Sequence, residues 1–494
     1  MDIDYYLGRV ESHGFFETWE DVLRIATSDD VKDFSKFYEA GLAVENKHEK
    51  KRNGVYFTPD DVAGMMGHWF SLMKGENVAD VGCGVGNLIL AFLKVIGTEK
   101  ARELILSERL FLYDRSSLAL RICRRSICLL YGEDLNEHIR VVHGDFLDRD
   151  IHLPKNCKVL SNPPYFRIEA VSERWNVTDI INDSKELYAA FMEKIMDEAV
   201  GSIILTPQSF LGGSKFLSLR KKMSEHYCSI FAFDNEPGTI FIGRKQGMFT
   251  PHGNKNYVRA AITMCDGTDD NFKGCNVSGM IRFHNKERGE LFGGYGQVGR
   301  FLGSSLQKID ERHTKFAKCF PDLECILEKL ESRSVKFGEL LSDDGEFPLC
   351  VPNTCRYFTV GSVMDLKRDG KYNFKFKDRD IRDLMYCWVN SSFCYWHWRL
   401  YDGSIVYQLG LLKDMPVVVD FKDGNKARLL GLAREMQGRE NECMRLNKMR
   451  GVPQENILFP ETYKDEINAI ILDELGSIAN ADIFNVVHSH SIFG

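Results

Sequence analysis

The chain has 494 residues, of which 44% are hydrophobic and 27% are charged, and its formal net charge is −7 at pH 7. This length allows about two to three domains with a large core, and the acidic balance excludes a surface coated uniformly in positive charge. No apolar stretch is long enough to span a bilayer, no amino-terminal segment indicates secretion, and the fourteen cysteines form no C-x-x-C zinc pair. We therefore expect a cytoplasmic protein with reduced thiols and no metal site.

Residues 1 to 50 form the first predicted segment. They contain two stretches of helical composition and lead into the basic run Lys47-His-Glu-Lys-Lys-Arg52. Such a run is typical of a solvated loop, although it could also approach phosphate groups. We predict an N-terminal helical segment over residues 1 to 50.

A glycine-rich turn, Asp80-Val-Gly-Cys-Gly-Val-Gly86, lies between a short apolar strand and a stretch of helical spacing at residues 87 to 94. Alternating glycines allow positive φ angles and leave no Cβ between the turn and a ligand. The acid before the first glycine and the G-x-G-x-G spacing distinguish it from the dinucleotide fingerprint. Such a turn can also simply connect packed elements. The pattern resembles the S-adenosylmethionine loop of class I methyltransferases, which implies cofactor-binding roles for Asp80, Gly82, Gly84 and Gly86.

The next predicted strand tests this resemblance, because a ribose-binding acid is expected at its carboxyl end. Residues 109 to 114 are largely apolar and end in Asp114, which is the candidate for the ribose hydroxyls. Glu108 is a competitor at the other end of the strand. The separation from the glycine turn is long, so an additional turn or helix is expected at residues 97 to 107.

A third strand is predicted at residues 139 to 143, followed by Gly144-Asp145-Phe146-Leu147. The resemblance implies that Asp145 accepts a hydrogen bond from the adenine amino group of the cofactor and that Phe146 packs along the ring. Asp114 and Asp145 could each also be an ordinary carboxylate at the end of a strand. Their order along the chain favours cofactor binding.

The tetrapeptide Asn162-Pro-Pro-Tyr165 directly follows a fourth predicted strand. The exocyclic nitrogen of adenine is a poor nucleophile because its lone pair is delocalised into the ring. If the Asn162 side-chain oxygen and the Pro163 carbonyl accept its two N–H bonds, the lone pair faces the methyl donor. Pro163 and Pro164 hold this backbone in a fixed shape, and Tyr165 offers a face for base stacking. A Pro-Pro pair can also form a merely rigid turn, but Asn162 and Tyr165 on either side favour a catalytic role for all four residues.

With its cofactor motifs ahead of the catalytic one, the chain resembles a DNA amino-methyltransferase of the N6-adenine type, with the gamma-type motif order. The resemblance covers roughly residues 45 to 265. It implies a Rossmann-like class I α/β fold with a mostly parallel seven-stranded sheet, S-adenosylmethionine as the cofactor, and a target adenine flipped out of duplex DNA.

Three alternatives stay open at this point. N4-cytosine methylation needs the same chemistry on another exocyclic amine, although Asn before the prolines and Tyr after them favour adenine. RNA or protein methylation is disfavoured because the C-terminal half is larger than those enzymes usually need. The chain could also be a non-catalytic DNA-binding or specificity subunit built on a methyltransferase scaffold, but intact residues at every motif count against that.

The segment Gly54-Val-Tyr-Phe-Thr-Pro59 resembles the part of the family that precedes the glycine turn and packs over the methionine moiety of the cofactor. The resemblance implies that Tyr56, Thr58 and Pro59 are contacts. Alternatively, Thr58 and Pro59 could cap and open the helix that follows, with proline at the first helical position. Both roles can coexist.

After the catalytic strand, residues 237 to 241 and 257 to 263 resemble the family's late hairpin, in which an aromatic residue stacks on the flipped base. The resemblance implies this role for Phe241, with Tyr165 on the other face of the base. A core phenylalanine is the competing interpretation.

Beyond this point, aromatic and turn-rich segments such as residues 394 to 401 replace the motifs. The family places target recognition there, so we predict a methyltransferase domain over residues 51 to 268. Residues 269 to 494 would form an α+β target-recognition domain with C-terminal helices at about 429 to 447 and 463 to 475. Duplex DNA is the expected partner, bound in a basic cleft on an acidic body. The family's common setting implies restriction-modification with a separate cognate endonuclease or specificity subunit, and no membrane.

Overall fold

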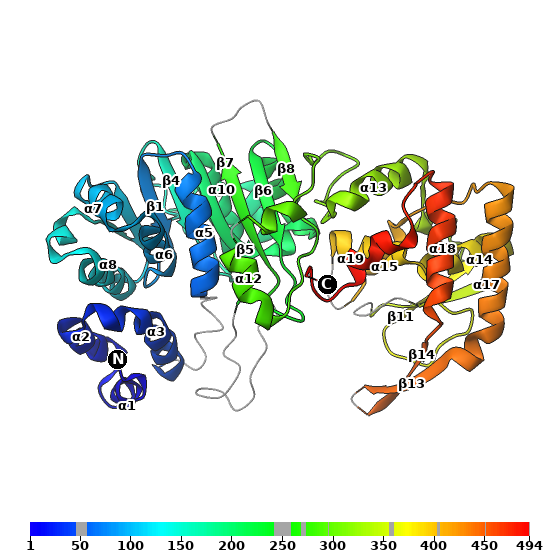
Figure 1. The fold of residues 1–494 in the computed structure, drawn as a ribbon, viewed down its shortest axis with the longest axis horizontal. Helices are drawn as coiled ribbons and strands as arrows, with labels where there is room; N and C mark the ends of the chain where they lie inside the picture. The colour runs from blue at the N-terminus through cyan, green and yellow to red at the C-terminus, as the bar shows by residue number, and fades with distance from the viewer. Residues whose placement is uncertain are drawn as a thin grey trace. The chain divides into compact units, whose positions relative to one another are not determined.

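The computed structural model describes residues 1–45, 57–241, 258–267, 273–294, 296–354, 360–402, 406–449 and 451–493. Tyr56, the basic run at 47–52 and much of the late hairpin therefore lie outside the described residues. The chain divides into two compact units: unit 1 contains Met1–Phe316 with His490–Gly494, and unit 2 contains Ala317–Ser489. Figure 1 traces the elements of each unit along the chain. Unit 1 extends past residue 268, the end of the predicted methyltransferase domain.

Eight strands form the sheet of unit 1, in the order β3-β2-β1-β4-β5-β7-β6-β8. The strands are β1 (Asn77–Val81), β2 (Leu110–Asp114), β3 (Arg140–His143), β4 (Cys157–Ser161), β5 (Gly201–Pro207), β6 (Tyr227–Ala232), β7 (Ala260–Asp266) and β8 (Gly274–Val277). Neighbours from β3 to β5 pair in parallel, as do β6 and β8, whereas β7 runs antiparallel to β5 and β6. The predicted mostly parallel sheet is confirmed. The predicted count of seven strands is wrong, because β8 has only four residues and shows no alternation that the sequence could reveal.

Burial along the strands follows from this topology. β4 is buried throughout, and β1 and β5 are buried at all but one position, as expected for parallel strands covered on both faces. β3 lies at one edge and is largely exposed. Helices flank the sheet (Figure 1): α5 (Asp60–Leu72), α6 (Asn87–Ile96), α7 (Thr98–Leu106), α8 (Ser117–Tyr131), α9 (Asp179–Ser184), α10 (Leu187–Glu198), α11 (Leu217–Met223) and α12 (Arg288–Gly293). The helix expected at residues 97 to 107 is α7, and that prediction is confirmed.

Three helices precede the sheet: α1 (Ile3–His13), α2 (Phe15–Ile25) and α3 (Val31–Glu45). The sequence predicted two, but Gly14 adopts a φ of 92° and separates α1 from α2, a conformation that favours glycine. Trp19 is fully buried, and its ring centroid lies 4.7 Å from that of Phe37. The same core contains Val85 of the glycine turn and Ile122 of α8. The N-terminal helices therefore pack directly beside the glycine turn.

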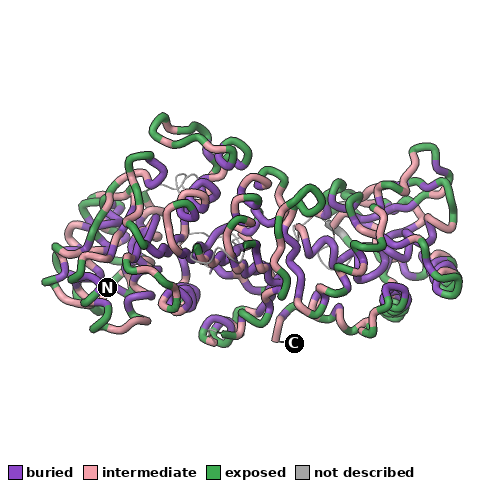
Figure 2. The backbone as a smooth tube through the Cα atoms, turned by 90° about the horizontal axis from the view of Figure 1, so that it is seen from above, coloured by how far each residue is buried: buried purple, intermediate pink, exposed green. Residues whose placement is uncertain are grey.

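Unit 2 combines helices with two-stranded sheets. Its elements include α13 (Pro321–Arg333), α14 (Arg379–Val389), α15 (Ser392–Tyr401), α16 (Leu409–Lys413), α17 (Asp423–Cys443), α18 (Glu461–Glu474) and α19 (Asn485–His488), with strand pairs β9 (Val335–Lys336) and β12 (Pro416–Val417), β10 (Phe347–Pro352) and β11 (Lys371–Phe376), and β13 (Met444–Met449) and β14 (Val452–Ile457). The two expected C-terminal helices correspond to α17 and α18. Trp396 and Trp398 of the aromatic segment are buried within α15. Figure 2 colours the backbone by how far each described residue is buried, with buried stretches in purple. These aromatic residues form core rather than a base-stacking surface.

Cys228 and Cys265 lie opposite each other on β6 and β7 and form a disulfide. The prediction that all thiols are reduced is wrong for this pair, because strand pairing joins two cysteines that are 37 residues apart in the sequence. Across the described ranges, no group of His, Cys, Asp or Glu side chains could hold a metal ion. Of the helices described, none has both the length and the apolar composition needed to cross a membrane.

Candidate active site

The carboxyl ends of β1, β2 and β4 bring the predicted cofactor-binding and catalytic residues together. Val81, the last residue of β1, lies opposite Tyr113 of β2 and Ser161 of β4. The Ser161 hydroxyl donates a hydrogen bond to the Val81 carbonyl at 2.7 Å. The glycine turn and Asn162 therefore begin at neighbouring strand ends.

The glycine turn has two open positions and one packed position. Gly82, Gly84 and Gly86 adopt φ angles of 73°, 53° and 97°, which glycine reaches at little cost. A Cβ added to Gly86 would lie 2.6 Å from Cys123 Sγ, so this glycine permits close packing against α8. A Cβ on Gly82 or Gly84 would come no closer than 3.8 Å to another described atom. The backbone at these two positions is thus accessible to a ligand.

Asp114 connects the end of β2 to the glycine turn through a hydrogen bond. Its Oδ2 accepts a hydrogen bond from the Gly84 N–H, and its Oδ1 accepts one from the Ser116 N–H, both at 2.8 Å. Burial raises the pKa of Asp114 above its usual value, although these backbone donors oppose the shift. The competitor Glu108 sits before the amino end of β2 and forms an ion pair with Arg140. Asp114 is therefore the acid placed at the predicted cofactor edge.

Asp80 lies beneath the turn instead of facing solvent. It is 1% exposed, and its Oδ2 accepts a hydrogen bond from the Ile89 N–H of α6 at 3.2 Å. Its Oδ1 has no hydrogen-bond partner among the described residues. Burial raises the pKa of Asp80 to about 8, so the carboxyl group is largely neutral at pH 7. Its direct role here is to anchor the first turn of α6.

Asp145 and Phe146 follow β3 but differ in exposure. Asp145 is half-buried, and its Oδ1 accepts a hydrogen bond from the Leu147 N–H at 3.1 Å. Phe146 is buried between Tyr113 and Phe191, with ring centroids 5.7 and 5.4 Å away. Phe146 therefore forms part of the core, and its contact with an adenine ring stays a prediction.

Asn162 is held at both ends of its amide group. Its Nδ2 donates a hydrogen bond to Thr58 Oγ1 at 3.0 Å, and its Oδ1 accepts one from the Tyr165 hydroxyl at 2.5 Å. The same hydroxyl lies 2.9 Å from the Leu205 carbonyl of β5. A tyrosine hydroxyl has a single proton, so the Asn162 oxygen and the Leu205 carbonyl compete for it. Pro163 is buried beside Asn162, which fixes the backbone of the tetrapeptide.

Phe241 lies near Tyr165, as predicted, but the two rings do not enclose a base-sized gap. Their centroids are 6.0 Å apart and their planes are inclined at 68°, an edge-to-face contact. A base between two parallel rings needs about 7 Å, twice the ~3.5 Å separation of touching carbon atoms. Phe241 is also only 3% exposed. The predicted stacking on both faces of a base therefore requires these rings to move apart.

Thr58 and Pro59 precede α5 in the predicted position. Pro59 is the residue before the first helical residue, Asp60, so it does not occupy the first helical position as predicted. Thr58 is 2% exposed, and its carbonyl accepts a hydrogen bond from Asn87 Nδ2 at 3.0 Å. The sequence interpretation did not assign Asn87 or Ser116 to this site. Only their positions in the sequence could have identified these two residues, since Asn87 directly follows the glycine turn and Ser116 lies two residues after Asp114.

Three arginines of unit 1 each contact a carboxylate. Arg259 and Arg282 both donate to the buried Asp234, at 2.9 and 3.0 Å. Arg288 of α12 forms a two-pronged ion pair with Asp61 of α5, with both N···O distances at 2.8 Å. These pairs do not test the predicted basic cleft, which stays a prediction.

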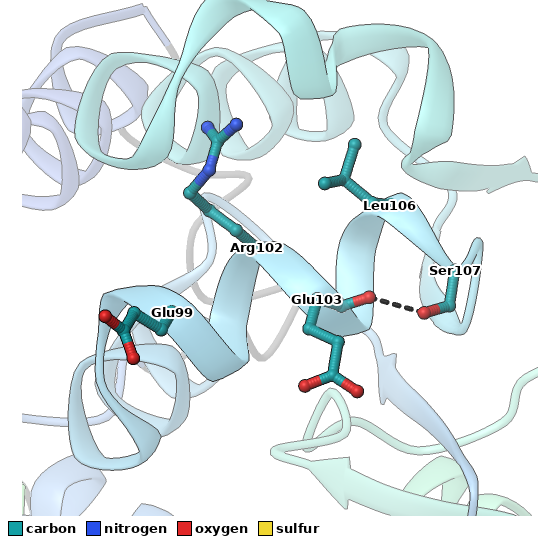
Figure 3. A pocket seen from close by; sticks show the side chains of 5 residues that line it. All are labelled: Glu99, Arg102, Glu103, Leu106 and Ser107. Carbon is teal, nitrogen blue, oxygen red and sulfur yellow. Dashed lines mark hydrogen bonds between the residues drawn. The ribbon is translucent and has the colours of Figure 1, made fainter.

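A cavity of about 540 Å³ lies along α7, apart from these strand ends (Figure 3). It is lined by Glu99, Arg102, Glu103, Leu106 and Ser107. Arg102 donates to the Asp134 carboxylate and to the Tyr131 carbonyl, so its guanidinium is occupied by structural contacts. This opening belongs to a single helix and contains none of the predicted site residues.

Residues 29–244 match the model of the N-6 DNA Methylase family. This segment covers less than half of the chain and contains the glycine turn, Asp114, Asp145 and the Asn-Pro-Pro-Tyr tetrapeptide. The match shows that this segment is similar to N-6 DNA methylases. No curated protein matches the chain.

Solved structures with similarity to the chain include the DrdV–DNA complex, with 16% identity and a TM-score of 0.45 over 59% of this chain and 34% of that one. The modification subunit of a putative type I restriction enzyme from Vibrio vulnificus YJ016 has 15% identity and a TM-score of 0.36, over 64% of this chain and 62% of that one. The ATP-dependent type ISP restriction-modification enzyme LlaBIII bound to DNA has 11% identity and a TM-score of 0.46, over 92% and 47%. The chain therefore spans less than two thirds of each of these three proteins.

Proposed function

We propose that this chain transfers a methyl group from S-adenosylmethionine to N6 of adenine in DNA. The observation that carries the proposal is the adjacency of two motifs. β1 leads into the glycine turn, and its parallel neighbour β4 leads into Asn162-Pro-Pro-Tyr165. A cofactor on the turn and an amine at Asn162 would meet at neighbouring strand ends, and such proximity can supply much of the rate enhancement.

The residues at these strand ends fit S-adenosylmethionine. The backbone is open at Gly82 and Gly84, and the Asp114 carboxylate, which can accept about four hydrogen bonds, has acceptor capacity left for a ribose hydroxyl. Asp145 is proposed to accept a hydrogen bond from the adenine amino group of the cofactor, while Pro59 is a proposed contact of its methionine part. When bound, the cofactor supplies a methyl group on a positively charged sulfur.

The target adenine must leave the base stack, because its amino group cannot reach the donor inside the duplex. Asn162 Oδ1 and the Pro163 carbonyl then accept the two N–H bonds, so the nitrogen lone pair points at the methyl group. The new N–C bond forms as the S–C bond breaks, and the methylated nitrogen releases one proton to water. Tyr165 and Phe241 contact the base after their rings separate.

Duplex DNA is the proposed substrate, and residues 269 to 494 are the proposed target-recognition and C-terminal helical region. A restriction-modification or related defence system is the proposed setting. A cognate endonuclease or a specificity subunit would then be a separate chain. The family of the matched segment supports this proposal.

The test is transfer of labelled methyl groups to unmethylated genomic DNA, followed by nucleoside digestion and mass spectrometry. N6-methyladenine is the expected product. N4-methylcytosine would keep the mechanism and change the base, whereas cofactor binding without any methylated nucleoside would contradict DNA as the substrate of the isolated chain.

The first prediction concerns Asn162. Replacing Asn162 with Ala should lower turnover by at least about 1,000-fold, because the amine loses its side-chain acceptor at the transition state, while the Kd for S-adenosylmethionine changes by less than about threefold. Methyl transfer and calorimetric titration measure the two quantities. Asn182→Ala, at an exposed position of α9, is the matched control and should retain both. Wild-type turnover in the Asn162 variant would refute the catalytic assignment.

A further inference from the structure

We infer that Thr58 is a positioning residue for Asn162 and that the N-terminal helix α3 supports it through Asn87. The inference deepens the proposed function and rests on it. It differs from the sequence interpretation, in which Thr58 was expected to contact the cofactor.

The geometry forms a continuous chain of hydrogen bonds. Asn87 Nδ2, at the start of α6, donates to Ser35 Oγ of α3 and to the Thr58 carbonyl, both at 3.0 Å. The Thr58 hydroxyl in turn lies 3.0 Å from Asn162 Nδ2. Residues 35, 58, 87 and 162 are far apart in the sequence and meet only in the folded protein.

The contact with Thr58 matters because the two ends of an amide are chemically different. Only Oδ1 of Asn162 can accept a hydrogen bond from an exocyclic amine, whereas Nδ2 can only donate. With Nδ2 directed at Thr58 Oγ1, Oδ1 lies at the other end of the amide, toward Tyr165. The hydrogen bond to the Thr58 hydroxyl thereby holds the Asn162 side chain in place, with Oδ1 on the side of Tyr165.

The burial of Thr58 separates this role from direct catalysis. At 2% exposure, its side chain acts through Asn162 and has little surface for a ligand. Asn87 holds the Thr58 backbone from one side, and Ser35 holds Asn87 in turn. Helix α3 therefore contributes to the position of Asn162, which lies more than a hundred residues later in the sequence.

The experiment compares Thr58→Val with Thr58→Ser in the full chain, using labelled-methyl transfer to DNA. Valine keeps the shape and removes the acceptor, so kcat should fall about tenfold, the loss typical of one hydrogen bond. The Kd for S-adenosylmethionine and the KM for DNA should stay within about threefold. Serine keeps the hydroxyl and should restore kcat to within about twofold of wild type.

Thr18→Val is the matched control, because Thr18 is also fully buried but donates only to the Gly14 carbonyl near the start of its own helix. It should leave kcat unchanged. Equal kcat in Thr58→Val and wild type would overturn the inference, as would equal losses in the serine and valine variants. If Asn162→Ala itself retains turnover, the proposed function fails instead, so the two failures are distinguishable.

A second variant covers the case in which Thr58→Val does not fold. Ser35→Ala removes the acceptor of Asn87 and keeps Thr58, and alanine is favourable within α3. We expect kcat to fall by about two- to fivefold with an unchanged Kd for S-adenosylmethionine. An unchanged kcat in Ser35→Ala would show that α3 does not support Thr58. If kcat is also at the wild-type level in Thr58→Ala, the whole inference is overturned.

Discussion

At the scale of single residues, the candidate site is defined by competition for a few hydrogen bonds. The Tyr165 hydroxyl donates to Asn162 Oδ1, the same atom that is proposed to accept the amine of the target base. This oxygen has two lone pairs, so it can accept from Tyr165 and from the base together, and the Leu205 carbonyl at 2.9 Å offers the hydroxyl another acceptor. Tyr165 thus has two separable parts, a ring that can stack on a base and a hydroxyl that uses one lone pair of Asn162 Oδ1.

This separation predicts different effects for two variants of Tyr165. Tyr165→Phe keeps the ring and leaves Asn162 Oδ1 able to accept from the base, so kcat/KM for DNA should stay within about fivefold of wild type. Tyr165→Ala also removes the stacking face and should lower kcat/KM by roughly 10- to 100-fold, since stacking contributes about 1–3 kcal/mol per base. Steady-state methyl transfer measures both. A loss in Tyr165→Phe as large as that in Tyr165→Ala would show that the hydroxyl itself is required.

At the scale of elements, the sequence predicted those features that local chemistry determines. The glycine turn and the acid that ends β2 carry signals within a few residues, namely alternating glycines and a strand-end carboxylate. The helix α7 was inferred from the long stretch of chain between the turn and the next strand. The break at Gly14 and the short strand β8 were missed, because a single glycine and a four-residue strand are too short to show a periodic hydrophobic pattern. The link from Thr58 to Asn162 has no local signal at all. Nor does the edge-to-face contact of Tyr165 with Phe241, which depends on how distant segments pack.

The packing of β4 against α5 yields a prediction about stability. Lys158 of β4 is buried, and its Nζ donates to the Phe70 and Met73 carbonyls at the end of α5, at 2.9 and 3.0 Å. Burial lowers the pKa of Lys158 to about 8, below the unfolded value of about 10.4. Between these values the unfolded chain binds more protons, so the free energy of unfolding should rise with pH. This contribution is present above pH ~10.4 and is lost as the pH falls through about 8.

Lys158→Met isolates this contribution, because methionine has a similar length and no charge. Between pH 8 and 10, the free energy of unfolding of the wild type should increase relative to the variant by roughly 1–2 kcal/mol, after allowing for partial solvent screening. Urea unfolding at several pH values measures the difference. Parallel pH profiles for the two proteins would contradict a lowered pKa for Lys158.

At the scale of the whole molecule, a formal net charge of −7 must be reconciled with a polyanionic substrate. The three arginines that contact Asp234 and Asp61 show that positive charge in unit 1 is partly used within the fold. DNA binding does not require a positive total, because affinity depends on the few phosphates that are contacted and on the counterions they release. The proposed function therefore requires local positive charge on an acidic body.

This requirement predicts a difference in salt dependence between the two proposed ligands. Each phosphate contact lowers the slope of log K against log salt concentration by about 0.9, so four to six contacts should weaken DNA binding by about 100- to 2,000-fold between 50 and 200 mM salt. S-adenosylmethionine is proposed to bind at the strand ends and carries little net charge, so its Kd should change by less than about threefold over the same range. Fluorescence anisotropy with duplex DNA and calorimetry with the cofactor measure the two slopes on the same protein. If the Kd for duplex DNA does not change with salt concentration while cofactor binding is intact, the protein does not contact the phosphate backbone. This result would favour a substrate other than duplex DNA.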